Sequence, residues 1–332
     1  MRETNERECM HYQTLEGQAV RCLLCPHHCR LEAGQRGLCR GRANIDGKLM
    51  AINYARSIGV ALDPIEKKPL YHFRPGSRVI SLGPNSCNLS CFFCQNSNSS
   101  QEECLTRRMS PEELRDLVQR ESGEEARQVA FTYTEPLTWY EYIYDFAQLA
   151  REVDIVLVTN AFIDPEPLDE LLPYVKAMNI DLKSMRTEFY QQHCGATLEP
   201  VLRNIRSAFE AGVHLELTNL LIPGLNDSEA EIKELVEFVS GLGKEIPLHF
   251  SAYHPAFRAI IPATPENTVL QACRIASRKL DHVYAGNIRS AEFQATLCPN
   301  CSSEVISARR QPLALTAEGC CSHCSQPIHG VF

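Results

Sequence analysis

Eleven of the sixteen cysteines in this 332-residue chain fall into three short clusters, and these clusters limit what the chain can fold into. The first runs from Cys22 to Cys39, the second from Cys87 to Cys94 and the third from Cys298 to Cys324. Disulfide frameworks are typical of small secreted proteins. This chain is long, and its first residues lack the apolar core of a signal peptide. We therefore expect reduced thiols that bind metals.

The charge balance and the hydropathy of the chain argue against two classes of partner. The formal net charge is −8. Non-specific binding to nucleic acid needs Lys and Arg to neutralise phosphates, so we expect no nucleic-acid partner. No stretch approaches the roughly 20 uninterrupted apolar residues of a membrane-spanning helix. We expect a soluble, cytoplasmic protein with no membrane partner, long enough for one barrel-sized domain or about two to three smaller units.

Short apolar, β-branched runs alternate with helical patterns between the first and the last cysteine cluster, which predicts strands and helices in turn. The expected strands are 78–83, 128–133, 154–159, 177–181, 213–218, 246–251 and 282–286. The expected helix starts are Ser110-Pro111 with Glu113 as a capping box, Asp164-Pro165, Asp227-Ser228 and Thr264-Pro265. Strand–helix units in series predict an α/β fold with a parallel sheet.

Polar residues near the ends of these strands favour a barrel over a doubly wound sheet. A (β/α) barrel gathers its active site from many loops, whereas a doubly wound sheet concentrates it at one switch point. The polar residues are Thr132, Glu135, Thr159, Asn160, Asp181, Lys183, Thr218, Asn219, His249 and Asn287. We expect a partial or full TIM-like barrel over residues 76–292, preceded by a cysteine-rich metal-binding segment at 1–75 and followed by a zinc-ribbon-like module at 293–332.

The central cluster has the spacing C-x3-C-x2-C, with Cys87, Cys91 and Cys94 in a loop after the first expected barrel strand. Thiolates are the ligands that iron–sulfur clusters take, so three cysteines can hold three irons of a [4Fe-4S] cluster. The fourth iron would then stay open to a small molecule. In the same way, a catalytic zinc keeps one coordination position free, whereas a structural zinc has all four filled by the protein. The alternative is a structural zinc loop completed by a nearby histidine.

This loop resembles the cysteine motif of the radical S-adenosylmethionine (SAM) superfamily, with Phe93 as its aromatic residue. The resemblance implies that SAM binds the open iron. It also implies that one electron from the cluster cleaves SAM to methionine and a 5′-deoxyadenosyl radical, which abstracts hydrogen from a substrate. An electron donor such as flavodoxin or ferredoxin is implied as well. The three cysteines are therefore the predicted catalytic residues.

Further residues are expected to bind the cofactor because they match positions of the superfamily or of the glycyl-radical-enzyme activating enzymes. They are Glu135 for the SAM ammonium, Asp181 and Lys183 in an Asp-Leu-Lys motif for the ribose and carboxylate, and His249 on the sixth strand. Phe93 of the cysteine motif and Asn160 at a strand end are also expected to bind the cofactor. The glycines that accompany the glutamate in the superfamily are missing here. The alternatives are a capping or hydrated loop role for Glu135 and Asp181, and a core role for His249.

The C-terminal cluster consists of two C-x2-C knuckles, Cys298 with Cys301 and Cys321 with Cys324, joined by 19 residues. Four thiolates at this spacing suit one tetrahedral zinc, as in a zinc ribbon. A structural or partner-docking role follows, because every coordination position would be filled. Rubredoxin-like iron is the alternative. Cys320 is left out, since the spacing selects Cys321.

The N-terminal cluster contains four thiols at irregular spacing. They are Cys22, Cys25, Cys29 and Cys39, which could hold a zinc or a second, fully ligated [4Fe-4S] cluster that relays electrons. For His27 and His28 we expect surface-loop roles rather than ligation. The remaining cysteines are expected to be isolated thiols: Cys9, Cys104, Cys194, Cys273 and Cys320. Among them, Cys194 is a candidate for a redox or substrate role because it closely follows Asp181.

Over nearly its whole length the chain resembles the radical SAM enzymes of the AmmeMemoRadiSam system, which are related to pyruvate-formate-lyase-activating enzymes. The matching stretches are 22–29, 63–73, 91–96, 181–183, 221–224, 253–255 and 330–332. Ser86 and Ala161 stand where the family has glycine, which implies altered turns rather than lost chemistry. The resemblance implies partners of the Memo and AMMECR types.

Our leading hypothesis is a SAM-cleaving radical enzyme that acts on a small molecule or on a substrate delivered by a partner. One alternative is an activating enzyme that installs a glycyl radical on a protein, although the smaller activating enzymes lack the zinc ribbon. Another is a non-catalytic zinc protein used for docking, against which the acidic balance and the strand-end polar residues argue. The charged segment from Asp63 to Phe73 could contact substrate or SAM, or be a salt-bridged linker over the barrel.

Overall fold

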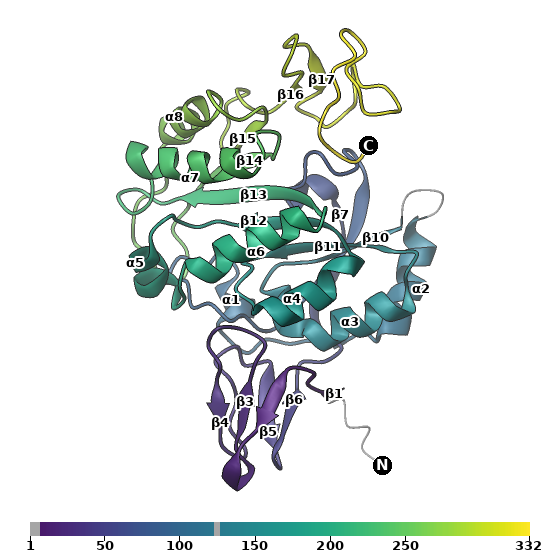
Figure 1. The fold of residues 1–332 in the computed structure, drawn as a ribbon, viewed down its shortest axis with the longest axis vertical. Helices are drawn as coiled ribbons and strands as arrows, with labels where there is room; N and C mark the ends of the chain where they lie inside the picture. Colours follow the sequence, from purple (N-terminus) through teal and green to yellow (C-terminus); the bar gives the residue numbers. More distant parts are fainter. Residues whose placement is uncertain (1–6, 123–126) are drawn as a thin grey trace.

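A nine-stranded sheet forms the centre of the part of the chain that the computed structural model describes, residues 7–122 and 127–332 (Figure 1). Its strands are β7 (Arg56–Pro64), β8 (Arg78–Pro84), β9 (Arg107–Arg108), β10 (Gln128–Phe131), β11 (Asp154–Thr159), β12 (Val175–Asp181), β13 (His214–Leu221), β14 (Leu248–Ala252) and β15 (Val283–Gly286). The order is β15-β14-β13-β12-β11-β10-β8-β7-β9. Neighbours from β8 to β15 run parallel. The predicted α/β fold and each expected strand are confirmed.

The sheet is open at both edges. Among the described residues, β15 pairs only with β14, and β9 pairs only with β7. The antiparallel strand β7 occupies the side of β8 that a closed barrel would offer to β15. Because both sides of β8 are already paired, the described strands form an open, mostly parallel sheet and not the closed form of the expected barrel.

Helices follow most of the parallel strands, as the alternating pattern predicts. The longer ones are α2 (Pro111–Ser122), α3 (Tyr140–Leu149), α4 (Pro165–Leu171), α6 (Glu199–Glu210), α7 (Glu229–Leu242) and α8 (Glu266–Ala276). Short helical turns are α1 (Ser97–Ser100), α5 (Thr187–Phe189), η2 (Ile65–Lys67), η3 (Pro136–Trp139), η4 (Leu172–Tyr174) and the π-helical turn η5 (Tyr190–Cys194). In Figure 1, α3, α4 and α6 lie over the middle strands, and α7 and α8 lie beside β14 and β15.

Two of the predicted caps are formed by side chains. Ser110 Oγ accepts a hydrogen bond from Glu113 N at 3.2 Å, and Ser110 N donates to Glu113 Oε2 at 2.6 Å. This is the predicted capping box of α2, in which two free amides are satisfied reciprocally. Ser228 Oγ accepts from Glu231 N at 3.3 Å and caps α7.

Two other helices begin where expected, and Asp164 is the N-cap residue of α4, but neither helix has a side-chain cap. The side chain of Asp164 does not cap α4, because its carboxylate pairs with His28 at 2.6 Å. The cap residue of α8 is Pro265, and the hydroxyl of Thr264 instead donates to Leu221 O at 2.5 Å. In both cases a partner distant in sequence takes the side chain that the local pattern assigned to the helix.

Two small antiparallel sheets precede the central sheet and lie at one end of the molecule (Figure 1). One has the order β1 (Arg7–Glu8), β6 (Lys48–Ala51), β5 (Arg42–Ile45), and the other β2 (Tyr12–Thr14), β3 (Val20–Cys22), β4 (Arg30–Leu31). A buried ion pair joins the first to α3, since Arg42 Nη2 lies 2.7 Å from Glu141 Oε2. Strand β7 lies within the expected segment 1–75 and yet belongs to the central sheet.

The C-terminal module lies at the opposite end of the long axis (Figure 1). Its strands β16 (Thr296–Leu297) and β17 (Glu304–Ile306) pair antiparallel, and it has a small apolar core of its own. The chain end then returns to the central body, where Val331 N donates to His72 O at 2.8 Å and Arg74 N donates to Val331 O at 2.6 Å. The module is therefore attached to the segment between β7 and β8.

The ends of β8 and β10 approach each other closely at Gly83. A Cβ atom at this position would lie 2.0 Å from Thr132 O, so only glycine allows this approach. This contact brings the loop after β8 against the loop after β10.

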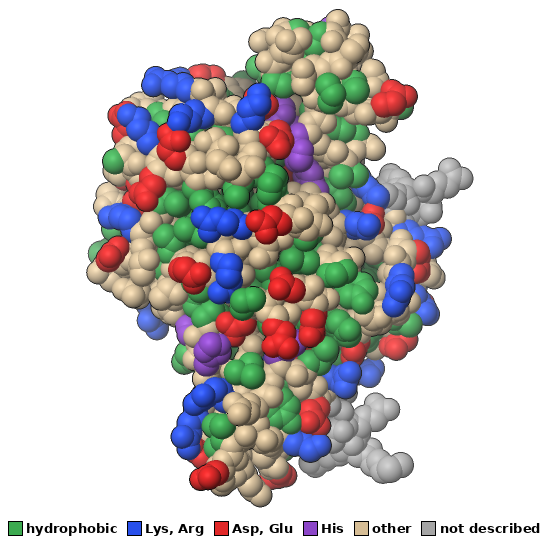
Figure 2. Space-filling model, viewed as in Figure 1, with side chains coloured by type: hydrophobic (Ala, Val, Ile, Leu, Met, Phe, Trp, Pro, Cys, Tyr) green, Lys and Arg blue, Asp and Glu red, His purple; other side chains and the backbone are tan. Residues whose placement is uncertain are grey.

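None of the described helices is long and apolar enough to cross a membrane. Acidic and basic side chains are interspersed over the face that Figure 2 shows.

Candidate active site

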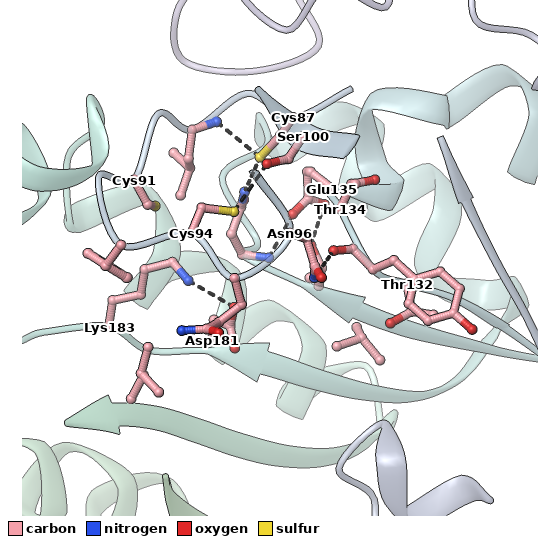
Figure 3. A pocket seen from close by; sticks show the side chains of 18 of the residues that line it. Cys87, Cys91, Cys94, Asn96, Ser100, Thr132, Thr134, Glu135, Asp181 and Lys183 are labelled. Carbon is pink, nitrogen blue, oxygen red and sulfur yellow. Dashed lines mark hydrogen bonds and ion pairs between the residues drawn. The ribbon is translucent and has the colours of Figure 1, made fainter. Parts of the chain in front are cut away.

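A cavity of about 520 Å³ opens where the carboxyl ends of β10, β11 and β12 meet the loop after β8. Figure 3 shows Cys87, Cys91 and Cys94 on one side of it and Thr132 on another. Of the strand-end polar residues, the cavity is lined by Thr132, Glu135, Thr159, Asn160, Asp181 and Lys183. The cysteine loop and several strand ends therefore line one cavity.

The cysteine loop is held in place by backbone hydrogen bonds to distant segments. Ser90 N donates to Cys194 O at 2.9 Å, and Phe92 N donates to His193 O at 3.2 Å, both in η5. On the other side, Arg258 N donates to Phe92 O at 3.1 Å. A ligand loop fixed at several points keeps its three thiols directed at one space, which is what a bound metal cluster requires.

The thiols of this loop differ in their surroundings. Burial raises the pKa of Cys87, whereas a hydrogen bond from Cys194 lowers the pKa of Cys91 against the effect of burial. Cys94 Sγ lies 3.1 Å from Ser100 Oγ. Cys194, singled out from the sequence as a redox or substrate candidate, thus contacts a predicted cluster ligand.

The donor set suits an iron–sulfur cluster better than a single zinc. A tetrahedral zinc with Zn–S bonds of about 2.3 Å holds its thiolates roughly 3.8 Å apart. Among the described residues, the C-terminal cysteines alone form a group of three or more potential ligands within 4.8 Å of one another, so the three thiols of this loop are more widely spaced. No histidine is among the described residues that line the cavity. The zinc alternative therefore lacks both the thiol spacing and the histidine that was expected to complete it.

Glu135 lines the cavity and accepts three hydrogen bonds. Its Oε1 accepts from Leu137 N at 3.0 Å and from Thr159 Oγ1 at 2.6 Å, and its Oε2 accepts from Asn160 N at 2.8 Å. Burial raises its pKa from 4.5 to about 7. The residue thus caps η3, as the alternative interpretation held, and it also lines the cavity.

Asp181 and Lys183 form an ion pair at the cavity wall, with 2.9 Å between Asp181 Oδ2 and Lys183 Nζ (Figure 3). The side chain of Lys183 is 15% exposed and that of Asp181 is 40% exposed, so the carboxylate is the more accessible partner. Both residues line the cavity together with the cysteines.

Two other predicted cofactor-binding residues also lie at the cavity. Phe93 is buried, and its ring centroid is 5.3 Å from that of Phe92. Asn160 Nδ2 donates to Asn88 Oδ1 at 3.0 Å and lies 4.0 Å from Cys87 Sγ. Asn160 therefore connects the end of β11 to the cysteine loop.

His249 lies elsewhere. It is not among the residues that line the cavity, and its Nε2 is 2.6 Å from Oε2 of the fully buried Glu216. Its ring also packs edge-on against Tyr71, with 4.6 Å between the centroids. These contacts agree with the alternative of a core histidine, and a contact with SAM stays a prediction. Three other strand-end residues bond within the fold instead of lining the cavity: Thr218, Asn219 and Asn287.

The charged segment that the sequence singled out contributes Asp63 and Lys68 to a polar wall of the cavity, where they meet Tyr133, a contact that the sequence did not predict. Tyr133 Oη and Lys68 Nζ each donate to Asp63 Oδ2 at 2.8 Å, and Lys67 Nζ donates to Oδ1 at 3.0 Å. All four residues line the cavity, so the charged segment is both salt-bridged and part of the site. Tyr133 has a positive φ of 73°, which is rare for a bulky residue. Its position in Thr132-Tyr133-Thr134, directly after a strand, was the available signal.

Other residues of the charged segment are used inside the fold. Glu66 Oε1 accepts from Gly76 N at 2.6 Å. His72 is fully buried, with its Nδ1 2.5 Å from His329 O and its Nε2 2.5 Å from Tyr284 Oη. Neither residue lines the cavity.

The C-terminal cysteines have the geometry of a single metal site. Cys298 Sγ lies 3.5 Å from Cys324 Sγ, and Cys301 Sγ lies 3.7 Å from Cys321 Sγ. These distances agree with the roughly 3.8 Å edge of a tetrahedral zinc–thiolate site. Cys320 is not part of the group, as predicted from the C-x2-C spacing of Cys321 and Cys324.

Comparison with known proteins gives the following relatives. The sequence model of the Radical SAM superfamily matches residues 83–239. "Uncharacterized protein MJ0808" of Methanocaldococcus jannaschii is 42% identical over 308 residues, which cover 90% of this chain and 91% of that protein.

Two enzymes with assigned names match about half of the chain. A "Probable GTP 3',8-cyclase" of Methanosarcina acetivorans is 32% identical over 173 residues, covering 49% of this chain and 50% of that protein. "Benzylsuccinate synthase activating enzyme" of Thauera aromatica is 25% identical over 189 residues, covering 54% of this chain and 56% of that protein. The chain thus spans about half the length of each of these two enzymes.

Proposed function

The chain belongs to the radical SAM superfamily, and from that premise we propose that it is a SAM-cleaving enzyme whose [4Fe-4S] cluster is held by Cys87, Cys91 and Cys94. When bound, the cluster and SAM supply a 5′-deoxyadenosyl radical that abstracts hydrogen from a substrate. One observation carries the proposal: the three thiols share a cavity with polar strand ends, and the described lining contains no fourth cysteine. Three thiolates leave one position of a four-iron cluster for SAM.

Glu135 has one acceptor site left for the SAM ammonium. A carboxylate offers about four lone-pair sites, and donors from Leu137, Thr159 and Asn160 occupy three of them. The remaining site is on Oε2, which accepts only from Asn160 N. We assign the other polar groups of SAM to the exposed carboxylate of Asp181 and to Lys183, which lie on the neighbouring strand end.

The wall formed by Asp63, Lys67, Lys68 and Tyr133 is proposed to bind the substrate. Two ammonium groups and one carboxylate leave a local surplus of one positive charge. Lys67 is the accessible cation, because its side chain is 67% exposed whereas that of Lys68 is 1% exposed. A small polar substrate with a negatively charged group fits this arrangement.

The charged wall of the cavity supports a small polar molecule as the substrate. The whole cavity of about 520 Å³ lies within the range of roughly 300 to 1,000 Å³ that is typical of small-molecule sites, and it would hold the cluster and SAM as well. The similarity to an activating enzyme keeps glycyl-radical installation as a second candidate. On the matching stretches given above, we place the chain in the AmmeMemoRadiSam branch, with a reduced flavodoxin or ferredoxin as electron donor and proteins of the Memo and AMMECR types as partners.

The test is to reconstitute the full chain anaerobically, reduce it, add SAM and quantify 5′-deoxyadenosine. The triple variant C87A/C91A/C94A should lose product formation, and Cys104→Ser, an isolated thiol outside the cavity, should retain it. Product formation that survives the triple variant would overturn the proposal. Deuterium transfer into 5′-deoxyadenosine from a labelled small-molecule extract supports a small substrate, whereas transfer only from a protein fraction supports the activating enzyme.

A further inference from the structure

The four N-terminal cysteines surround a cavity of their own, separate from the active site. The thiols of Cys22, Cys25, Cys29 and Cys39 all line it, and three of these residues are at most 9% exposed. They come from the end of β3 and from the loops around β4, and Cys22 N donates to Cys29 O at 3.0 Å. Four thiols that line one small cavity form a complete ligand set for a metal group.

The spacing of these thiols does not match a single zinc. As in the active-site loop, no three of them lie within 4.8 Å of one another, whereas the four C-terminal thiols all do. Gly37 lies between two of them: a Cβ atom there would be 3.9 Å from both Cys29 Sγ and Cys39 Sγ. Because four irons lie between the thiolates of a cubane cluster, such a cluster holds its ligands further apart than one zinc does. The N-terminal set therefore resembles the cluster loop, not the zinc ribbon.

Arg42 places two hydrogen-bond donors without partners at the wall of this cavity. It is 1% exposed, and its Nη2 is bound by the carboxylate of Glu141. Its Nε and Nη1 have no hydrogen-bond partner although both are buried. A buried donor without an acceptor is unfavourable because it has lost its hydrogen bonds to water, so an anionic group in the cavity is the natural acceptor. An iron–sulfur cluster with four thiolates is such a group, and its sulfurs accept hydrogen bonds.

One residue of the active-site loop also lines this cavity. Asn88 follows Cys87 directly, and Nε2 of His27 lies 2.7 Å from its carbonyl oxygen. On the other side, Asn88 Oδ1 accepts from Asn160 Nδ2, the group next to Cys87 Sγ. Asn88 therefore connects the N-terminal cavity to the side chain that lies next to Cys87.

We propose that Cys22, Cys25, Cys29 and Cys39 bind a second [4Fe-4S] cluster, closed by four thiolates, and that Arg42 donates hydrogen bonds to its sulfurs through Nε and Nη1. The site lies beside the active-site loop, and its assignment does not depend on SAM cleavage there. Since all four irons would carry a thiolate, this second cluster has no position for substrate.

The test uses the full chain reconstituted with iron and sulfide while zinc is also present. In C87A/C91A/C94A the proposal expects about four irons and four sulfides per chain, with a [4Fe-4S] Mössbauer spectrum. The variant C22S/C25S/C29S/C39S should lose this second set and keep the iron of the active-site loop. If C87A/C91A/C94A contains no iron and instead two zincs per chain, the N-terminal site is a zinc site and the proposal is wrong. This outcome is independent of whether the wild-type chain cleaves SAM.

A second measurement examines Arg42 without removing a ligand. In the C87A/C91A/C94A background, Arg42→Lys keeps a charge for Glu141 but loses the two unpaired donors. The reduction potential of the remaining cluster should shift to a more negative value, because fewer hydrogen bonds reach its sulfurs. Arg36→Lys is the matched control, since Arg36 is in the same segment and forms an exposed pair with Glu103. Equal potentials in the two variants would contradict the role of Arg42.

Discussion

The carboxylate of Glu135 accepts a hydrogen bond from the hydroxyl of Thr159 at 2.6 Å, across the ends of β10 and β11. Both residues are buried, and two backbone amides bind the same carboxylate. Burial nevertheless raises the pKa of Glu135 to about 7, because it penalises the charged form more than these donors favour it. This residue therefore titrates near neutral pH.

The raised pKa of Glu135 predicts a pH dependence of stability. In the folded chain the group holds its proton up to about pH 7, whereas in the unfolded chain it loses the proton near its model value of 4.5. Its contribution to stability is therefore full below pH 4.5 and is lost as the pH rises through 7. Urea unfolding at pH 5 and pH 8 should show a loss of stability in the wild type that is smaller in Glu135→Gln. Equal losses in both proteins would contradict the assignment.

The pair of Asp63 and Lys68 predicts a large effect of one substitution. The side chain of Lys68 is 1% exposed, so Asp63→Asn leaves a buried charge without its partner. A loss of about 3–5 kcal/mol in unfolding free energy is expected. Lys67→Ala, which removes the exposed partner of the same carboxylate, should cost less than about 1 kcal/mol. The comparison is made by denaturant unfolding, and similar losses in the two variants would show that the buried pair is not formed.

Cys194 is predicted to tune the active-site cluster without binding it. Its thiol donates to Cys91, and it is not part of the cavity lining. Cys194→Ala should therefore keep the iron content of the wild type, while the loss of a hydrogen bond to a ligand sulfur moves the reduction potential to a more negative value. The measurement is an EPR-monitored redox titration combined with iron analysis. Loss of iron would instead make Cys194 a ligand.

The C-terminal module is predicted to depend on one zinc. Cys298→Ser should lower the zinc content by about one per chain and unfold the small apolar core around Val305 and Ile306, because a structural zinc contributes directly to folding. Cys320→Ser should leave the zinc in place, since Cys320 is not in the group of four. Zinc analysis and limited proteolysis measure both effects. Unchanged zinc in Cys298→Ser would contradict the site.

The sequence predicted the parts of the fold that local patterns determine. Apolar runs gave the parallel strands, and Ser110 with Glu113 gave the start of α2, because these preferences act over a few residues. Cysteine spacing likewise predicted the four-thiol group from Cys298 to Cys324. Asp164 and Thr264 make no side-chain caps, since distant partners, His28 and Leu221, bind the same side chains.

What the sequence could not predict depends on pairings between distant segments. The sheet stays open because β7 pairs with β8, and nothing in the run from Arg56 to Pro64 indicates that partner. The same pairing brings Asp63 to Tyr133 and builds the polar wall of the cavity. His249 was expected at the cofactor, but Glu216 on the neighbouring strand lies against it. The N-terminal thiols could be separated from a zinc set only by their distances.

The central claim is that Cys87, Cys91 and Cys94 leave one iron open to SAM. The most direct measurement is the EPR spectrum of the reduced chain with and without SAM, combined with ENDOR on SAM labelled with ¹⁵N at its amino group. We predict that SAM changes the spectrum, that the ¹⁵N nucleus couples to a cluster, and that both effects are absent in C87A/C91A/C94A. A spectrum that SAM leaves unchanged, without ¹⁵N coupling, would contradict the claim.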